Sequence, residues 1–326
     1  MSQPHPYAAL TPDRVLDAIE STGRLTDARV FPLNSYENRV YQVGIEGGQP
    51  LIAKFYRPDR WTRDQILEEH RFTAELHAEG LSVVPPLTDT EGQSLWHFAG
   101  FDFALFARQG GYPPELDNLD HLHTLGCHLG QLHAIGKREP FQFRPSLDAR
   151  SFGHDSAAFL LDGFIPSSLQ EAYRTLSRDL LVKVDAAFAR FTPKLLRLHG
   201  DCHPGNILWR DEVPHLVDFD DARMGPAIQD LWMLLSGDRQ QQHQQLAEII
   251  EGYEMFSEFD PRELSLVEPL RTLRMMHYAA WLARRWQDPA FPKAFSWFNT
   301  ERYWAEHILE LREQMSALDE PPLRLQ

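Results

Sequence analysis

Two neighbouring stretches decide the fold of this 326-residue chain, HGDCHPGNIL at residues 199–208 and LVDFDD at residues 216–221. They contain Asp201, Asn206 and Asp218. Phosphoryl transfer uses an Asp that accepts the proton of the attacking hydroxyl, then an Asn that binds Mg²⁺, then a second metal-binding Asp, in this order and at similar spacing. The two stretches therefore predict a site for phosphoryl transfer in which Asp201 is the proton acceptor.

The chain between Asn206 and Asp218 has the pattern of a β-hairpin. Apolar residues 207–209 and 215–217 flank a polar turn around Glu212. Asn206 and Asp218 are equally far from Glu212, so we expect them opposite each other at the open end, with Cβ atoms about 4.5 to 5.5 Å apart. One cation can bridge such a pair, and amide and carboxylate oxygens suit Mg²⁺. We therefore predict Asn206 and Asp218 as Mg²⁺ ligands.

The same stretch leaves other uses open. His199, Cys202 and His203 could join the carboxylates in a transition-metal cluster, although zinc sites favour spaced pairs dominated by Cys or His. Cys202 beside His203 could be a thiol nucleophile, although adjacent residues rarely orient as nucleophile and base. A purely structural acidic turn would explain any one residue but not the joint spacing. His199 itself is predicted to be a buried histidine that braces the loop.

Length and composition indicate an intracellular protein with two lobes. A chain of 326 residues exceeds the usual single core. The 32 basic and 47 acidic residues give a net charge of -15, which disfavours nonspecific binding to nucleic acid or anionic membranes. Two cysteines, Cys127 and Cys202, cannot build a disulfide framework, and no apolar run is long enough to span a bilayer. We expect a soluble, cytoplasmic protein that binds neither nucleic acid nor membrane.

The order of predicted elements changes near Arg108. Before it, strand patterns dominate, with helices expected near residues 11–21 and 62–77. The strand patterns cover residues 30–33, 39–43, 51–56, 94–98 and 101–106. After Arg108 the pattern is helical. We therefore predict an α+β fold of two lobes, a β-rich N-terminal nucleotide-binding lobe at residues 1–108 and a mainly helical C-terminal catalytic and substrate lobe at residues 109–326.

Three local features are predicted more specifically. Thr62 and Gln65 have the spacing of a capping box, which starts a helix. Gly126 and Gly130 lie on a leucine-rich helical stripe and allow the close approach of another helix. Asp230 lies among apolar neighbours, and a buried Asp needs donors. We expect backbone amides of the catalytic loop to supply them.

A strand lysine and a helix carboxylate complete the predicted nucleotide site. Lys54 lies in the apolar run LIAKFY, as does the phosphate-binding lysine in the VAIK motif of protein kinases. Glu69 has helical spacing from Ile66 and Phe72, so it faces the apolar side, where an unpaired carboxylate is costly. We expect Lys54 to bind the nucleotide phosphates and to pair with Glu69. Glu68 is the alternative partner, and Lys54 taken alone could be an exposed strand lysine.

The first hairpin has the polar turn NSYEN at residues 34–38 in place of a glycine-rich phosphate loop. The Ser35 hydroxyl and the backbone N–H groups of this turn could bind a phosphate oxygen of ATP. Ordinary hairpin chemistry explains the turn equally well on local evidence.

Several of these segments resemble known proteins. LHGD at residues 198–201, with Asn206, is similar to the loop of aminoglycoside phosphotransferases, choline kinases and type II homoserine kinases, whose fold is protein-kinase-like. More specifically, the chain resembles bacterial stress response kinases of the YihE and RdoA type over essentially its whole length. The segments that carry this resemblance are LNSYENRVYQ (33–42), KFYRP (54–58), QILEEH (65–70) and DPAFPK (288–293).

The resemblance implies a monomeric, cytoplasmic serine/threonine protein kinase that depends on ATP and Mg²⁺ and acts in stress responses. It also implies that Ser35 binds ATP, that Asp201 is the proton acceptor, and that Asn206 binds Mg²⁺. Asp218 would be both a Mg²⁺ ligand and the second catalytic carboxylate. The metal motif departs from the DFG of eukaryotic kinases, because Asp220 replaces the glycine and lacks its backbone freedom. This difference argues against a DFG-type flip.

The local motifs indicate phosphoryl transfer and leave its acceptor open. A small-molecule kinase of the aminoglycoside, choline or homoserine type is the first alternative to a kinase that acts on Ser or Thr residues of proteins. A nucleotide-binding scaffold without catalysis is the second. The joint presence of Asp201, Asn206 and Asp218 argues against a scaffold, because a scaffold has no need of the base.

Overall fold

The computed structural model describes residue 5 and residues 7–325. The chain divides into two compact units, and each is described by itself. Unit 1 comprises Met1–Glu115, Phe141–Arg144 and Asp201–Ala222. Unit 2 comprises Leu116–Pro140, Pro145–Gly200 and Arg223–Gln326. The predicted α+β class, with a β-sheet in the N-terminal region and helices in the C-terminal region, is confirmed.

Unit 1 therefore continues past residue 108 to Glu115, and it also contains two separate later segments. The first is Phe141–Arg144, and the second, Asp201–Ala222, carries the predicted proton acceptor and metal ligands. A division into residues 1–108 and 109–326 stays a prediction about domain organisation.

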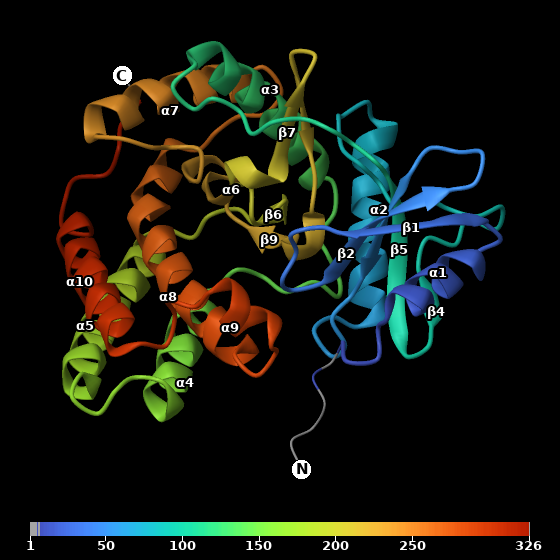
Figure 1. The fold of residues 1–326 in the computed structure, drawn as a ribbon. Helices are drawn as coiled ribbons and strands as arrows, with labels where there is room; N and C mark the ends of the chain where they lie inside the picture. Colours follow the sequence, from blue (N-terminus) through green and yellow to red (C-terminus); the bar gives the residue numbers. More distant parts are fainter. Residues whose placement is uncertain (1–4, 6, 326) are drawn as a thin grey trace. The chain divides into compact units, whose positions relative to one another are not determined.

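Unit 1 contains an antiparallel sheet (Figure 1). Its strand order is β1-β2-β3-β5-β4. The strands are β1 (Thr26–Pro32), β2 (Arg39–Ile45), β3 (Leu51–Phe55), β4 (Trp96–Phe98) and β5 (Phe101–Ala107). The register places Lys54 between Val40 of β2 and Ala104 of β5. Lys54 thus lies on the central strand of the sheet.

The two faces of this sheet pack against different helices. Phe55 shares an apolar core with α1 (Pro12–Glu20), whereas Ala104 packs with α2 (Arg63–Ala78). Because successive side chains on a strand point to opposite faces, Lys54 leaves the sheet on the α2 side. This alternation directs the lysine toward the helix that carries Glu69.

The helix α2 begins at the predicted capping box. The Thr62 hydroxyl accepts the Gln65 N–H at 3.3 Å, and the Gln65 side chain accepts the Thr62 N–H at 2.9 Å. Farther along, Phe72 packs edge-on against Phe141 and Phe219, with ring centroids 5.3 and 6.2 Å away. The helix therefore contacts both later segments of unit 1, Phe141–Arg144 and Asp201–Ala222.

The predicted hairpin is present as β7 (Ile207–Arg210) and β8 (Val213–Leu216). Its turn consists of Asp211 and Glu212, whose φ angles are 51° and 60°. Two central residues with positive φ match the twist of the flanking strands, and they define a two-residue hairpin turn.

This turn corrects the predicted register. The strands pair Ile207 with Leu216, and the Val217 N–H donates to the Asn206 carbonyl oxygen at 3.0 Å. Asn206 therefore lies opposite Val217, and Asp218 follows one residue later. The prediction was wrong by one position because it centred the hairpin on Glu212, whereas the centre lies between the two turn residues.

Unit 2 is mainly helical. Its helices are α3 (Leu119–Gly136), α4 (Asp155–Gly163), α5 (Gln170–Arg190), α6 (Ile228–Trp232), α7 (Arg239–Glu254), α8 (Val267–Arg285), α9 (Ala290–Ala294) and α10 (Glu301–Ala317), and its strand pair is β6 (Leu196–Leu198) with β9 (Arg223–Gly225). Within the described residues, no helix combines the length and apolar character needed to cross a membrane.

The helices α3 and α7 run side by side in unit 2 (Figure 1). A Cβ atom on Gly126 would lie 2.1 Å from the carbonyl oxygen of Ile249, and one on Gly130 would lie 2.3 Å from that of Tyr253. No side chain fits at such distances. The predicted close helix approach at these two glycines is confirmed.

Candidate active site

Lys54 is buried and contacts two carboxylates of unit 1. Its Nζ atom lies 2.9 Å from Oδ1 of Asp218 and 3.2 Å from Oδ1 of Asp220. Burial alone would lower the pKa of Lys54, but the carboxylates of Asp218, Asp220 and Glu69 hold that pKa well above its usual value. Lys54 therefore remains a cation beside the predicted metal ligand, and the exposed-lysine alternative is wrong.

The expected ion pair between Lys54 and Glu69 is not found among the described residues. Glu69 lies 4.0 Å from the guanidinium of Arg144 instead, and its buried Oε2 atom makes no hydrogen bond. Burial raises the pKa of Glu69 to about 7, although Lys54 and Arg144 act to lower it. The expected partner was wrong because Asp220, at the position of the DFG glycine, supplies a carboxylate to Lys54 directly.

The other helix carboxylate, Glu68, has a different set of partners. It accepts the backbone N–H groups of Gln142, Phe143 and Arg144 at 2.5, 2.9 and 2.8 Å. Glu68 therefore fixes the short segment of unit 1 that carries Arg144, and it does not pair with Lys54.

Asp220 and Arg60 form an ion pair that the sequence analysis did not predict. Arg60 also contacts Asp221 at 3.0 Å. Burial would raise the pKa of Asp220, but the Arg60 and Lys54 cations outweigh it and hold that pKa below its usual value. The sequence feature that could have indicated this pair is Asp220 itself. An acidic residue in place of the DFG glycine needs hydrogen-bond donors when it is buried.

Arg144 holds the backbone that follows Asp218. Its guanidinium donates to the carbonyl oxygens of Phe219, Asp220 and Ala222 at 3.2, 2.6 and 2.8 Å. Asp218 itself has φ 61° and ψ 62°, a left-handed conformation that Asp adopts more readily than most residues. Such a conformation persists where its surroundings fix it, and the hydrogen bonds from Arg144 provide that constraint.

Asn206 and Asp201 are joined within the catalytic loop. The Nδ2 atom of Asn206 donates to the backbone oxygen of Asp201 at 2.9 Å. Because this bond uses the Asn206 amide nitrogen, the Asn206 amide oxygen points away from the Asp201 carbonyl. His203 lies beside the same loop, with Nε2 3.5 Å from Oδ2 of Asp201.

Ser35 lies in the turn that joins β1 to β2. Its hydroxyl donates to the carbonyl oxygen of Asn38 at 3.2 Å, while the Asn38 side chain accepts the N–H of Arg57 at 3.1 Å. These bonds stabilise the turn and connect it to the end of β3. A role for Ser35 in binding ATP stays a prediction.

The buried Asp230 of unit 2 receives the donors that the sequence predicts. Its carboxylate accepts the N–H groups of His199 and Gly200 at 2.8 and 2.9 Å, and it contacts Nε2 of His133 at 3.1 Å. Burial would raise the pKa of Asp230, but His133, His199 and the Gly200 N–H together hold that pKa below its usual value. The prediction of backbone-amide donors is confirmed, and His199 is buried as expected.

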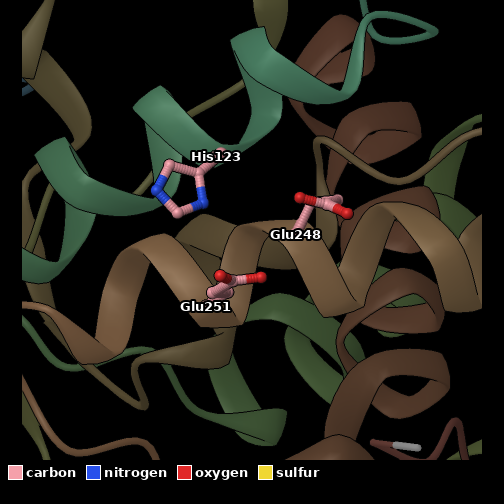
Figure 2. Close-up of side chains that lie close together, drawn as sticks. All are labelled: His123, Glu248 and Glu251. Atoms are coloured by element: carbon pink, nitrogen blue, oxygen red, sulfur yellow. The ribbon is translucent and has the colours of Figure 1, made fainter.

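A second group of side chains that could bind a metal ion lies in unit 2. None of them is a predicted site residue. His123 of α3 faces Glu248 and Glu251 of α7 (Figure 2), with candidate ligand atoms within 4.8 Å of one another. Glu251 is exposed, and surface acidic groups often lie this close without an ion. We therefore assign no metal to this group.

The sequence of the chain is similar to known phosphotransferases. A sequence profile of the phosphotransferase enzyme family matches residues 29–267. The chain is 47% identical over 321 residues to stress response kinase A of Escherichia coli (strain K12). The alignment covers 98% of this chain and 97% of that relative. It is 46% identical over 319 residues to serine/threonine protein kinase RdoA of Salmonella typhimurium (strain LT2), with the same two coverages of 98% and 97%.

Solved structures share the fold at lower identity. Amicoumacin kinase hAmiN in complex with AMP-PNP, Ca²⁺ and Ami has a TM-score of 0.71 at 19% identity, covering 91% of this chain and 90% of that chain. A microcompartment-associated aminopropanol kinase has a TM-score of 0.70 at 19% identity, covering 96% of this chain and 99% of that chain. These likenesses agree with the predicted kinase-like fold. With the family profile and the sequence relatives, they identify the chain as a phosphotransferase that belongs to the phosphotransferase enzyme family.

Proposed function

We propose that the chain is an ATP- and Mg²⁺-dependent serine/threonine protein kinase of the bacterial stress response. The observation that carries the proposal is the contact of Lys54 with Asp218 at 2.9 Å, because it joins the predicted phosphate-binding lysine to a predicted Mg²⁺ ligand. The names of the relatives, stress response kinase A and serine/threonine protein kinase RdoA, support a protein acceptor and the stress role. A monomeric, cytoplasmic enzyme is part of the same proposal.

Asn206 and Asp218 would hold the Mg²⁺ ion. Both offer oxygen ligands, which Mg²⁺ prefers. The side chain of Asp218 is 55% exposed and so accessible, and the Asn206 amide oxygen is not the atom that bonds Asp201. When bound, Mg²⁺ neutralises charge on the phosphate oxygens.

The remaining predicted residues have separate tasks. Lys54 binds the phosphates of ATP as a cation, and Ser35 with the N–H groups of its turn binds a phosphate oxygen. Asp201 orients the acceptor hydroxyl and accepts its proton at a carboxylate oxygen. Glu69 lies near Lys54 without an ion pair to it, so its contribution to nucleotide binding is electrostatic.

The test is a phosphorylation assay of the full chain with labelled ATP, Mg²⁺ and a generic basic protein. We expect label on Ser or Thr, found by phosphoamino-acid analysis, and none with the Asp201→Ala variant. The net charge of -15 favours cationic acceptors. Labelling should therefore weaken as salt rises, because screening limits surface charges to about 8 Å at physiological ionic strength.

A small-molecule kinase is the second candidate, favoured by the fold shared with an aminopropanol kinase and an amicoumacin kinase. A panel with an aminoglycoside, choline and homoserine, run beside the protein assay, separates the two. If a metabolite is labelled efficiently and no protein is labelled, the small-molecule activity replaces the protein kinase.

A further inference from the structure

Unit 2 contains a cavity of about 300 Å³ between α8 and α10. Its volume is at the lower end of the range for sites that bind small molecules. Aromatic rings, carboxylates and one histidine line it: Tyr278, Trp297, Tyr303, Glu306, His307 and Glu310. None of these residues belongs to the predicted phosphoryl-transfer site, so the cavity needs an explanation of its own.

The aromatic part of the lining is partly open. Trp297 is 47% exposed and Tyr278 is 42% exposed, although both are large rings. Tyr303 stacks on His307 and Tyr278 stacks on Trp281, whereas the ring contacts of Trp297 with Phe295, Phe298 and Tyr303 are edge-on or tilted. The face of an aromatic ring attracts cations within about 6 Å of its centroid.

The carboxylates give the cavity a negative charge. Partial burial raises the pKa of Glu310, and the carboxylates of Glu313 and Glu306 raise it further. Arg302 contacts Glu306 at 2.7 Å on the exposed side of α10. The lining itself contains the carboxylates of Glu306 and Glu310 and no lysine or arginine, so the cavity disfavours anions and favours a cation.

His307 supplies an uncharged hydrogen-bonding atom. Its side chain is 3% exposed, and its buried Nε2 atom has no hydrogen-bond partner. Burial lowers the pKa of His307 to about 4, so the ring is neutral near pH 7. In the tautomer with its proton on Nδ1, Nε2 is an acceptor. Buried polar atoms nearly always have a partner, and an N–H donor would satisfy this one.

We propose that this cavity binds a protonated primary amine carried on a short apolar chain, either a free small amine or a lysine side chain of another protein. The ammonium group faces the Trp297 ring and the carboxylate of Glu310, and one of its N–H groups donates to Nε2 of His307. The apolar chain contacts Met275 and the rings. This binding does not depend on nucleotide or on phosphoryl transfer, so it stands apart from the proposed kinase activity.

The probe for the test is butylammonium, titrated into the full chain without nucleotide and followed by ligand-observed NMR. Butanol has a similar shape without the charge, and butyltrimethylammonium has the charge without an N–H donor. We expect butylammonium to bind more tightly than either comparator. Equal binding of butanol would overturn the charge assignment and with it the proposal.

Two variants locate the binding. Glu310→Gln should weaken butylammonium about tenfold, in the range of a lost charge contact. Glu248→Gln removes the same charge from α7 and should leave the affinity unchanged. His307→Phe keeps a ring but removes the acceptor, so it should reduce butylammonium to the affinity of butyltrimethylammonium. Circular dichroism checks that each variant folds. If His307→Phe does not fold, Glu310→Gln still tests the proposal, because Glu310 is exposed.

An unchanged affinity in folded Glu310→Gln would overturn the proposal. A parallel titration with Nα-acetyl-lysine methylamide identifies the source of the amine. Binding as tight as that of butylammonium supports a lysine side chain of a protein. Binding of butylammonium alone supports a free small amine.

Discussion

The Nζ atom of Lys54 lies 2.9 Å from Oδ1 of Asp218. The lysine thus pairs directly with the carboxylate that is predicted to bind Mg²⁺, so the lysine and a bound metal ion would share the negative charge of one carboxylate. The side chain of Lys54 is 8% exposed whereas that of Asp218 is 55% exposed, so the carboxylate is the more accessible of the two groups.

Replacing Lys54 should affect metal and nucleotide in opposite directions. In Lys54→Met, Asp218 loses its competing cation, so Mn²⁺ alone should bind several-fold more tightly. MgATP should bind more weakly, because the phosphates lose a positive partner. Electron paramagnetic resonance measures free Mn²⁺, and Lys54→Arg is the control that keeps the charge. A loss of affinity for both ligands would contradict the shared-carboxylate interpretation.

Replacing Asp201 should separate chemistry from binding. Asp201→Asn keeps the size of the side chain but removes the base, so single-turnover transfer should fall by about 10² to 10⁴. MgATP affinity should stay near the wild-type value, because Asp201 contacts the acceptor in the proposed mechanism and not the nucleotide. Both quantities are measured on one preparation. Transfer near the wild-type rate would remove Asp201 from the mechanism.

The two predicted metal ligands should differ in strength. Asp218→Ala should weaken Mg²⁺-dependent nucleotide binding more than Asn206→Ala, because Asp218 supplies charge as well as an oxygen atom. Asn206→Asp should weaken Mg²⁺-dependent nucleotide binding less than Asn206→Ala does, since it keeps an oxygen ligand. Nucleotide titrations at several Mg²⁺ concentrations measure the effect. If neither alanine variant changes the metal dependence, this pair does not bind Mg²⁺.

Asp220→Asn should destabilise the fold. The change leaves Lys54 and Arg60 facing a neutral amide in a buried position, and removal of one partner of a buried pair costs about 3 to 5 kcal/mol. Asp221→Asn is a matched control, because Arg60 contacts both carboxylates but the Asp221 side chain is 32% exposed. Its cost should be about 1 kcal/mol or less. Urea unfolding compares the two, and equal costs would argue against a special role for Asp220.

Glu69 should make stability depend on pH. Its pKa is about 7 in the folded chain against 4.5 for the free group, so the folded state holds the proton more tightly. The resulting stabilisation is complete below pH 4.5 and is lost as the pH rises through 7. Glu69→Gln stays uncharged, so at pH 8 it should be more stable than wild type, by on the order of 2 to 3 kcal/mol.

The comparison for Glu69 uses thermal unfolding of both proteins between pH 5 and pH 8. Burial also raises the pKa of Glu263 to about 7, so a slope should remain in Glu69→Gln, and the difference between the two curves is the relevant quantity. Asp64→Asn, an exposed change on the same helix, should follow the wild-type curve. Parallel curves for wild type and Glu69→Gln would show that Glu69 is ionised throughout.

Features that rest on local chemistry could be predicted from the sequence. The capping box of Thr62 and Gln65 depends on residues three apart, and the strands and helices follow from the spacing of apolar residues. The close approach at Gly126 and Gly130 follows from the absence of a side chain. The need of Asp230 for donors follows from its apolar surroundings, and the nearby loop amides meet that need.

Contacts between residues that are distant in the sequence depend on how the chain folds in three dimensions. Asn206 faces Val217 because two turn residues take positive φ, a choice that apolar periodicity does not encode. Lys54 pairs with Asp218 and Asp220, because the backbone after Asp218 is held by Arg144 and Asp220 is held by Arg60. These residues are far apart in the sequence. Their charged side chains can pair only where the sheet and α2 bring them close together, and the sequence alone does not show which side chains become neighbours.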